Sequence, residues 1–162
     1  MIALAQRKVA RILFDEAHNE AWSIDLATAA RMQPNHPADS SYVQAASALA
    51  ERDFTVARNV DPITPETLRQ TDVLVIAHPS DAKWERTTGA GAPICGDGEI
   101  AAIRDFVRDG GGLIVMGETE QDKYGNNVNA LLREFGIAVD NATLTDHTHC
   151  DREVPSWVLA DL

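Results

Sequence analysis

Apolar residues gather in four short runs along the chain, and polar or amphipathic stretches separate them. The first run is Ile12 to Phe14, and the clearest one is Val73 to Ile76. The segments FTVARN, from residue 54, and GLIVMG, from residue 112, follow the same pattern. An uninterrupted apolar run is typical of a strand that is covered on both faces of its sheet. We therefore expect a strand at each of these four runs, the first of which ends near Asp15.

The stretches between the four apolar runs contain residues that are typical of helices and their caps. A loop is expected after the first strand, with a short helix near residues 23–32 as the alternative, and a longer helix is expected over about 41–52. Asp39 or Ser40 would cap the longer helix, because their oxygens can accept from the free backbone N–H groups of its first turn.

Three further segments complete the alternation of helices and strands. Residues 64–70 predict a short helix that Thr64 caps and that has Pro65 in its first turn. Residues 97–108 and 126–137 show apolar positions at helical spacing. A final strand is expected over residues 138–144, AVDNATL.

This order of elements predicts an α/β fold: a three-layer, doubly wound, mostly parallel sheet of the flavodoxin-like kind, with helices on both faces. We expect the domain to span residues 1–145. Residues 146–162 would then be an extension, which either packs back as a last strand or begins a further region of a longer protein.

Composition and charge narrow the function classes. The 162 residues carry a formal charge of −11, which repels phosphate backbones and argues against nucleic acid as a partner. No stretch approaches the roughly 20 apolar residues that cross a bilayer, and the first residues do not read as a signal peptide. We expect a cytoplasmic protein whose Cys95 and Cys150 are free thiols, with a disulfide between them as the alternative.

Polar residues follow the first, third and fourth expected strands. Ligands of doubly wound folds bind beyond the carboxyl ends of the strands, so these residues are the candidate ligand site. The alternative is that they are ordinary loop residues, with His78 packed against a backbone partner and Asp15 capping the segment after it. The candidates are Asp15, Glu16, His18, Asn19, His78, Ser80, Glu118 and Thr119.

A second cluster lies in the segment TDHTHCDRE. Asp146, His147, His149 and Cys150 are residue types that bind zinc, and the two histidines point the same way if the segment is extended. No second cysteine pair completes a structural zinc site, so a solvated connector is the alternative.

Cys95 lies just before a predicted helix, inside a Gly-rich insertion that follows the third strand. A helix N-terminus favours the thiolate, but the sequence assigns no base to this cysteine. The insertion itself is either a lid over the crevice or a surface for a partner.

Four segments carry a resemblance to a known family: RILFDEAH, TDVLVIAHP, EIAAIRDFVRDGGGLIVMGE and NVNALLREFGI. Together they resemble the class I glutamine amidotransferase-like superfamily over roughly residues 9–145. The likeness is greatest to its non-catalytic branches, which include the domain shared by intraflagellar transport and gliding-motility proteins and the trehalose-utilisation-type proteins.

Catalytic members of that superfamily place a nucleophilic cysteine directly after the strand that matches LIVMG, where this chain has Glu118. Their downstream His-x-Glu pair also has no match, since residues 147–149 read HTH. The resemblance therefore implies a fold without the thiol chemistry of the family.

These observations lead to one principal hypothesis and two alternatives. The principal one is a non-catalytic domain that binds a protein partner or a small ligand at the carboxyl edge of the sheet, without a cofactor and either as a monomer or as a homo-oligomer. The first alternative is a metal-assisted hydrolase that uses Asp15, His18, His78 and Glu118. The second alternative, implied by the trehalose-utilisation likeness, is a sugar- or nucleotide-binding sensor.

Overall fold

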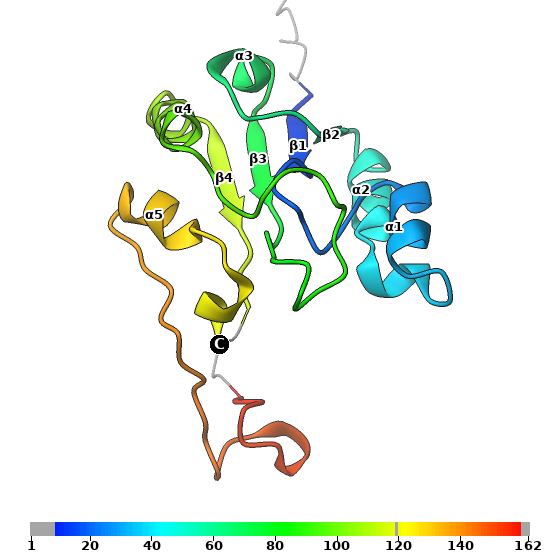
Figure 1. The fold of residues 1–162 in the computed structure, drawn as a ribbon, viewed down its shortest axis with the longest axis vertical. Coiled ribbons are helices and arrows are strands. Elements are labelled where there is room, and N and C mark those ends of the chain that lie inside the picture. Colours follow the sequence, from blue (N-terminus) through cyan, green and yellow to red (C-terminus); the bar gives the residue numbers. More distant parts are fainter. Residues whose placement is uncertain (1–8, 119, 160–162) are drawn as a thin grey trace, which may run out of the picture.

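The computed structural model describes residues 9–118 and 120–159. Four strands and five α-helices alternate along these residues, with three short 3-10 turns between them (Figure 1). The strands are β1 (Arg11–Asp15), β2 (Thr55–Asn59), β3 (Val73–Ile76) and β4 (Gly112–Val115). The α-helices are α1 (Leu26–Met32), α2 (Val43–Ala50), α3 (Pro65–Leu68), α4 (Asp97–Arg108) and α5 (Val128–Arg133). The 3-10 turns are η1 (Pro37–Ser40), η2 (Gln121–Tyr124) and η3 (Asp151–Glu153).

The sheet is parallel throughout, and its strand order is β2-β1-β3-β4. This is the order of a flavodoxin-like sheet up to its fourth strand, so the predicted α/β class is confirmed. The chain reverses direction across the sheet between β1 and β3, which are hydrogen-bonded neighbours. Doubly wound folds bind ligands at such a switch point.

Two apolar layers cover the sheet, one on each face. Leu74 and Ile76 of β3 pack with Ile103 of α4 and Leu131 of α5 on the first face. Ile12, Phe14 and Val75 alternate with them and form the second layer. In Figure 1 the sheet accordingly lies between α4 and α5 on one side and α1 and α2 on the other.

Several predicted helix features are confirmed, and one is wrong. Thr64 caps α3 by accepting from the backbone N–H of Thr67, and Pro65 opens the helix. Helix α4 spans the predicted residues. The predicted cap of α2 is wrong: Asp39 and Ser40 belong to η1, and the Ser41 hydroxyl accepts from the N–H of Val43 instead.

The predicted final strand over residues 138–144 does not form. Asn129 of α5 uses its side-chain amide to bind both the N–H and the C=O of Val139, at 2.8 and 2.9 Å. The Asn141 side chain likewise accepts from the N–H of Asp122. Side chains thus hold this segment against α5 and η2, and they occupy backbone groups that a strand would need.

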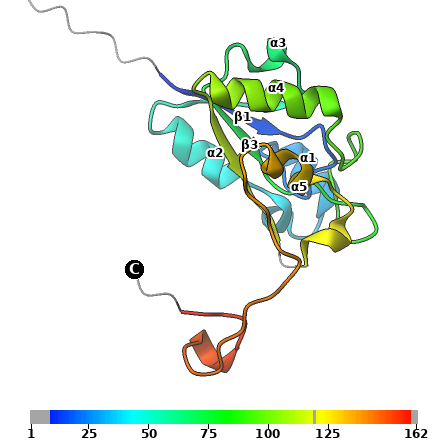
Figure 2. The ribbon, with the colours of Figure 1, turned by 90° about the vertical axis from the view of Figure 1, so that its left-hand side faces the viewer.

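Residues beyond this segment lead away from the sheet, as Figure 2 shows. They contain η3 and one isolated bridge between Cys150 and Val158. The predicted last strand over residues 154–162 therefore reduces to that bridge within the described residues. None of the helices in the described ranges has the length and apolarity needed to cross a membrane.

Candidate functional site

The predicted site residues of β1, β3 and β4 lie at one edge of the sheet, because these three strands are parallel neighbours. Most of them are buried, and Glu118 is the exposed exception. Thr119 lies outside the described residues. The buried members are Asp15, Glu16, His18, Asn19, His78 and Ser80.

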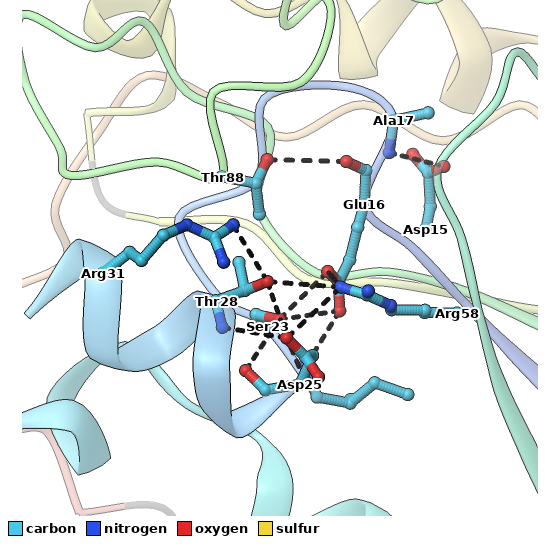
Figure 3. A network of polar contacts seen from close by, with 10 residues as sticks. Asp15, Glu16, Ala17, Ser23, Asp25, Thr28, Arg31, Arg58 and Thr88 are labelled. Atoms are coloured by element: carbon cyan, nitrogen blue, oxygen red, sulfur yellow. Dashed lines mark hydrogen bonds and ion pairs between the residues drawn. The ribbon is translucent and has the colours of Figure 1, made fainter.

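Glu16 is the centre of a satisfied polar network that joins the first turn of α1 to the sheet (Figure 3). Its carboxylate accepts from the Ser23 hydroxyl at 3.0 Å and from the backbone N–H of Ile24 at 2.9 Å. Arg58 of β2 adds an ion pair at 3.4 Å. Because its oxygens already have partners, Glu16 fixes α1 against β1 and β2 and is not free for a ligand.

His18 is held between two carboxylates. Its Nδ1 lies 2.5 Å from Asp15 Oδ2, and its Nε2 lies 3.1 Å from Glu99 Oε1. Burial lowers the pKa of His18, but the hydrogen bond to Asp15 and the Cys95 side chain outweigh burial and raise this pKa to about 11. His18 is therefore an imidazolium at neutral pH, which fits it to hold the two acids together and not to accept a proton.

Glu99 reaches this cluster from the first turn of α4. Its carboxylate also accepts from the backbone N–H groups of Ile63 and Gly96, both at 2.8 Å. Burial raises the pKa of Glu99, but these hydrogen bonds and His18 overcome burial and hold it below the ordinary value. An ionised Glu99 thus ties α4 to β1 and to the segment before α3.

Glu20 is the least satisfied member of the cluster. Its side chain is fully buried, and neither carboxyl oxygen has a hydrogen bond of good geometry within the described residues. Burial raises the pKa of Glu20 well above its usual value, and the nearby Asp15 carboxylate raises it further. Glu20 is therefore the acid in this cluster that favours the neutral form.

The insertion after β3 covers this cluster as a strap, which we define as residues 88–96. Thr88 donates its N–H to Glu20 O, and Ala90 O accepts from the N–H of Asn19. Cys95 is buried, and its backbone N–H and C=O both bind the Asn127 side chain. The strap thus packs over the buried cluster and leaves a pocket beside His18 and Glu99. Movement of the strap as a lid stays a prediction.

Gly91 allows the strap to lie close to the backbone of Ala17, in the segment after β1. Its φ is +66°, and a Cβ atom placed there would come within 2.2 Å of the Ala17 carbonyl oxygen. No L side chain fits such an approach without a shift of backbone.

His78 has a strained backbone at the end of β3. Its φ is +142°, a region that residues other than glycine rarely adopt. Its ring is buried edge-on against Tyr124, and neither ring nitrogen has a hydrogen-bond partner within the described residues. Burial lowers the pKa of His78, so the ring is neutral at pH 7.

Asn19 and Ser80 hydrogen-bond to each other near His78. The Asn19 amide donates to Ser80 O at 2.7 Å, and Ser80 N–H donates to Asn19 O. These bonds join the segment after β1 to the segment after β3.

The predicted metal residues lie far along the tail. Asp146 accepts from Thr148 and from the backbone N–H of His149, and these hydrogen bonds lower the pKa of Asp146 to about 2. His147 and His149 are exposed, and Cys150 is half-buried. Across residues 9–118 and 120–159, the structure brings no three His, Cys, Asp or Glu side chains into an arrangement that could share a metal ion. Zinc binding by Asp146, His147, His149 and Cys150 stays a prediction.

Sequence reasoning placed Asp15 beside His18 but missed two other side chains around this histidine. Glu99 lies 81 residues away and Cys95 lies in the strap, so only the tertiary fold brings them to the histidine. The capping-box position of Glu99, three residues after Gly96, was a readable signal, because such an acid turns back toward the helix start.

The fold and this edge of the sheet define a flavodoxin-like α/β domain with a buried, polar strand edge. A family model, the IFT52 GIFT domain, matches residues 39–151. The chain therefore belongs to the IFT52 GIFT domain family.

A solved structure described as mmIFT52 N-terminal domain shares this fold, with a TM-score of 0.63 and 19% sequence identity. The match covers 91% of this chain and 53% of that one, so the chain spans about half the length of this relative. Among curated proteins, none matches the chain.

Proposed function

We propose that this chain is a non-catalytic protein-binding domain that works within a larger assembly. One observation carries the proposal: on the face of the sheet beneath α1 and α2, the apolar side chains of β1 and β3 are buried, whereas those at β4 are exposed. Ile114 and Met116 of this region are 47% and 40% exposed. Parallel sheets are normally buried on both faces, so an open apolar face favours a partner.

The state of the polar edge supports the non-catalytic part of the proposal. Glu118 stands where catalytic amidotransferases carry their cysteine, and Cys95, which lies in the strap, is buried. We therefore propose that the chain is related to a non-catalytic branch of the class I glutamine amidotransferase-like superfamily.

Family membership supports the kind of assembly. The matching family model and the solved relative both carry the name IFT52. We propose that the partner is another subunit of an assembly of the intraflagellar-transport type, and that the contact forms in the cytoplasm.

Affinity purification of the tagged chain from its own cells, with chemical crosslinking and isotope-labelled mass spectrometry, tests this function. We expect a stoichiometric protein partner that an Ile114→Gln, Met116→Gln double variant loses at least about tenfold. Leu26→Gln is the matched control, since Leu26 is an exposed apolar residue on α1. Absence of any stoichiometric partner, or equal loss with the control, would contradict the proposal.

A small ligand at the carboxyl edge of the sheet is the second candidate function. The observation that favours it is the pair of buried side chains without hydrogen-bond partners, Glu20 and His78. A thermal-shift screen with sugars and nucleotides checks it, and metal analysis of untagged protein checks the hydrolase alternative with Asp15, His18, His78 and Glu118. Shifts that His78→Phe abolishes, with no protein partner captured, would favour this candidate.

A further inference from the structure

A small cavity lies between α1, the end of β2 and the strap, in the region that Figure 3 shows. Its volume is about 220 Å³, and all the residues that line it lie between Glu16 and Ala90. Two arginines reach it from different elements: Arg31 from the last turn of α1 and Arg58 from β2. The protein-binding function proposed above uses neither of these arginines.

Both guanidinium groups bind the same hydroxyl. Arg31 Nη2 and Arg58 Nη1 each lie 3.2 Å from Thr28 Oγ1, and Figure 3 shows them reaching it from two sides. The hydroxyl can accept from both arginines because its own hydrogen goes to Asp25 Oδ1, at 2.8 Å. The two nitrogens are therefore no further apart than the sum of their distances to this oxygen. Two positive charges this close repel each other, so negative charge between them would stabilise the arrangement.

Most N–H donors of these two arginines have no partner within the part of the chain that the structure describes. A guanidinium group carries five N–H donors in a planar fork. The printed contacts of Arg58 all run through Nη1, and the hydrogen bond of Arg31 runs through Nη2. Both side chains are exposed at the wall of the cavity. Their remaining N–H groups are therefore accessible to a ligand.

The two acids that line the cavity already have partners of their own. Glu16 accepts from the Ser23 hydroxyl and from the N–H of Ile24. Asp25 accepts from the hydroxyl and the N–H of Thr28, both at 2.8 Å, and these hydrogen bonds lower the pKa of Asp25. Two acids and two arginines give the lining a formal charge of zero, in a chain whose net charge is −11. An anion thus meets less repulsion here than the net charge implies.

A phosphate group matches this donor set in shape and in size. Arginine forks bind oxyanions through two parallel hydrogen bonds, and the terminal oxygens of a phosphate outnumber the two of a carboxylate, so two forks can share them. Pockets for drug-sized ligands measure roughly 300–1,000 Å³, so a cavity of about 220 Å³ suits a single phosphate group. A second cavity shares Val60 with the first and is lined in part by the apolar residues Pro62 and Ile94. It lies where the organic part of a phosphate ester would extend.

We propose that Arg31 and Arg58 bind a phosphate group, which belongs either to inorganic phosphate or to a small phosphate monoester. The inference goes beyond the protein-binding function and does not depend on it, because no residue of β4 lines the cavity. The net charge of −11 opposes a polyanion such as nucleic acid, whereas a single phosphate group needs only the two arginines.

NMR titration of the isotope-labelled chain at constant ionic strength tests the inference with three probes: inorganic phosphate, phenyl phosphate and acetate. We expect saturable shifts with both phosphate probes, largest at the amides of Thr28, Arg58 and Thr88, which line the cavity. Acetate should bind at least about tenfold more weakly, because it has fewer oxygens for the two forks. Tighter binding of phenyl phosphate than of phosphate would identify a monoester as the ligand, and equal affinity would identify inorganic phosphate.

Substitutions of Arg31 separate this site from general attraction of anions. Arg31→Gln should weaken phosphate binding about tenfold, because a charge-assisted contact is lost. Arg31→Lys keeps the charge but not the planar fork, so its affinity should lie between those of the wild type and Arg31→Gln. Arg52→Gln is the matched control, since it removes the same charge at an exposed arginine that does not line the cavity. It should leave phosphate binding unchanged.

Two results would overturn the inference. The first is no saturable shift with either phosphate probe, and the second is equal weakening by Arg31→Gln and Arg52→Gln. Thermal unfolding checks the fold of each variant, and if Arg31→Gln does not fold, Arg31→Lys with the affinity of the wild type would overturn the inference as well. The protein-binding function is tested separately by the variant at Ile114 and Met116, so either proposal can fail while the other stands.

Discussion

His18 Nδ1 lies 2.5 Å from Asp15 Oδ2, and both side chains are buried at the end of the same strand. The histidine thus links the carboxyl end of β1 to α4 through Glu99. This arrangement uses the charge of His18 to stabilise the fold, and it has a measurable pH signature.

Replacing His18 with glutamine should lower the free energy of unfolding by about 3 kcal/mol at pH 6, because two buried carboxylates lose their cation. The folded-state pKa of about 11 exceeds the unfolded value of 6.5. Stability from this group is therefore complete below pH 6.5 and is lost as the pH rises toward 11. Urea unfolding at pH 6, 8 and 10 should show the cost of His18→Gln shrinking with pH. The exposed His147→Gln variant is the control, and a cost independent of pH would contradict the assignment.

Glu20→Gln should make the protein at least as stable as the wild type at pH 7, and more stable at higher pH. Because burial raises the folded-state pKa of Glu20, the wild type loses stability as the pH rises above the ordinary glutamate value. A neutral amide of similar shape escapes that loss. Thermal unfolding between pH 5 and pH 9 measures the difference, with exposed Glu51→Gln for comparison. A variant that is less stable across the whole range would show that an ionised Glu20 stabilises the fold.

Gly89 and Gly91, both in the strap, provide a matched pair of substitution sites. Gly91→Ala should cost about 2 kcal/mol or more, because it combines a positive φ with a clash against Ala17 O. Gly89→Ala has a similar φ of +74° but no neighbour within 4 Å, so it should cost about 1 kcal/mol. Urea unfolding gives both values, and limited proteolysis should cut the strap faster in Gly91→Ala alone. Equal effects would mean that the close approach contributes nothing.

Thr64→Ala should lower stability by about 1 kcal/mol, since α3 loses the oxygen that accepts from Thr67 N–H. Thr64→Ser keeps this oxygen and should stay within about 0.5 kcal/mol of the wild type. Thermal unfolding of the two variants side by side decides the point, and identical losses would rule out capping as the cause.

Local signals predicted those parts of the fold that local interactions determine. The apolar run of β3, the Thr64 cap and the bounds of α4 could all be read from neighbouring residues. The segment over residues 138–144 looked like a strand, but the Asn129 amide competes for its backbone, and no local pattern reveals such a partner.

The candidate site shows the same limit. Sequence placed Asp15 and His18 at the end of β1, which requires only the local strand. The contact of His18 with Glu99 depends on where α4 lies against the sheet, which no local pattern gives. Glu20 was missed because an acid in a polar segment is normally solvated, whereas the fold buries this one fully.

The place of β1 in the sheet order also affects how the chain folds as the ribosome makes it. β1 emerges first, yet one of its two neighbours, β3, lies 61 residues later, as the contact between Arg11 and Asp72 shows. Until β3 is synthesised, one hydrogen-bonding edge of β1 remains unpaired. Pairing across such a distance closes a long loop and slows folding. During the interval between synthesis of β2 and β3, a chaperone would shield this unpaired edge from other chains.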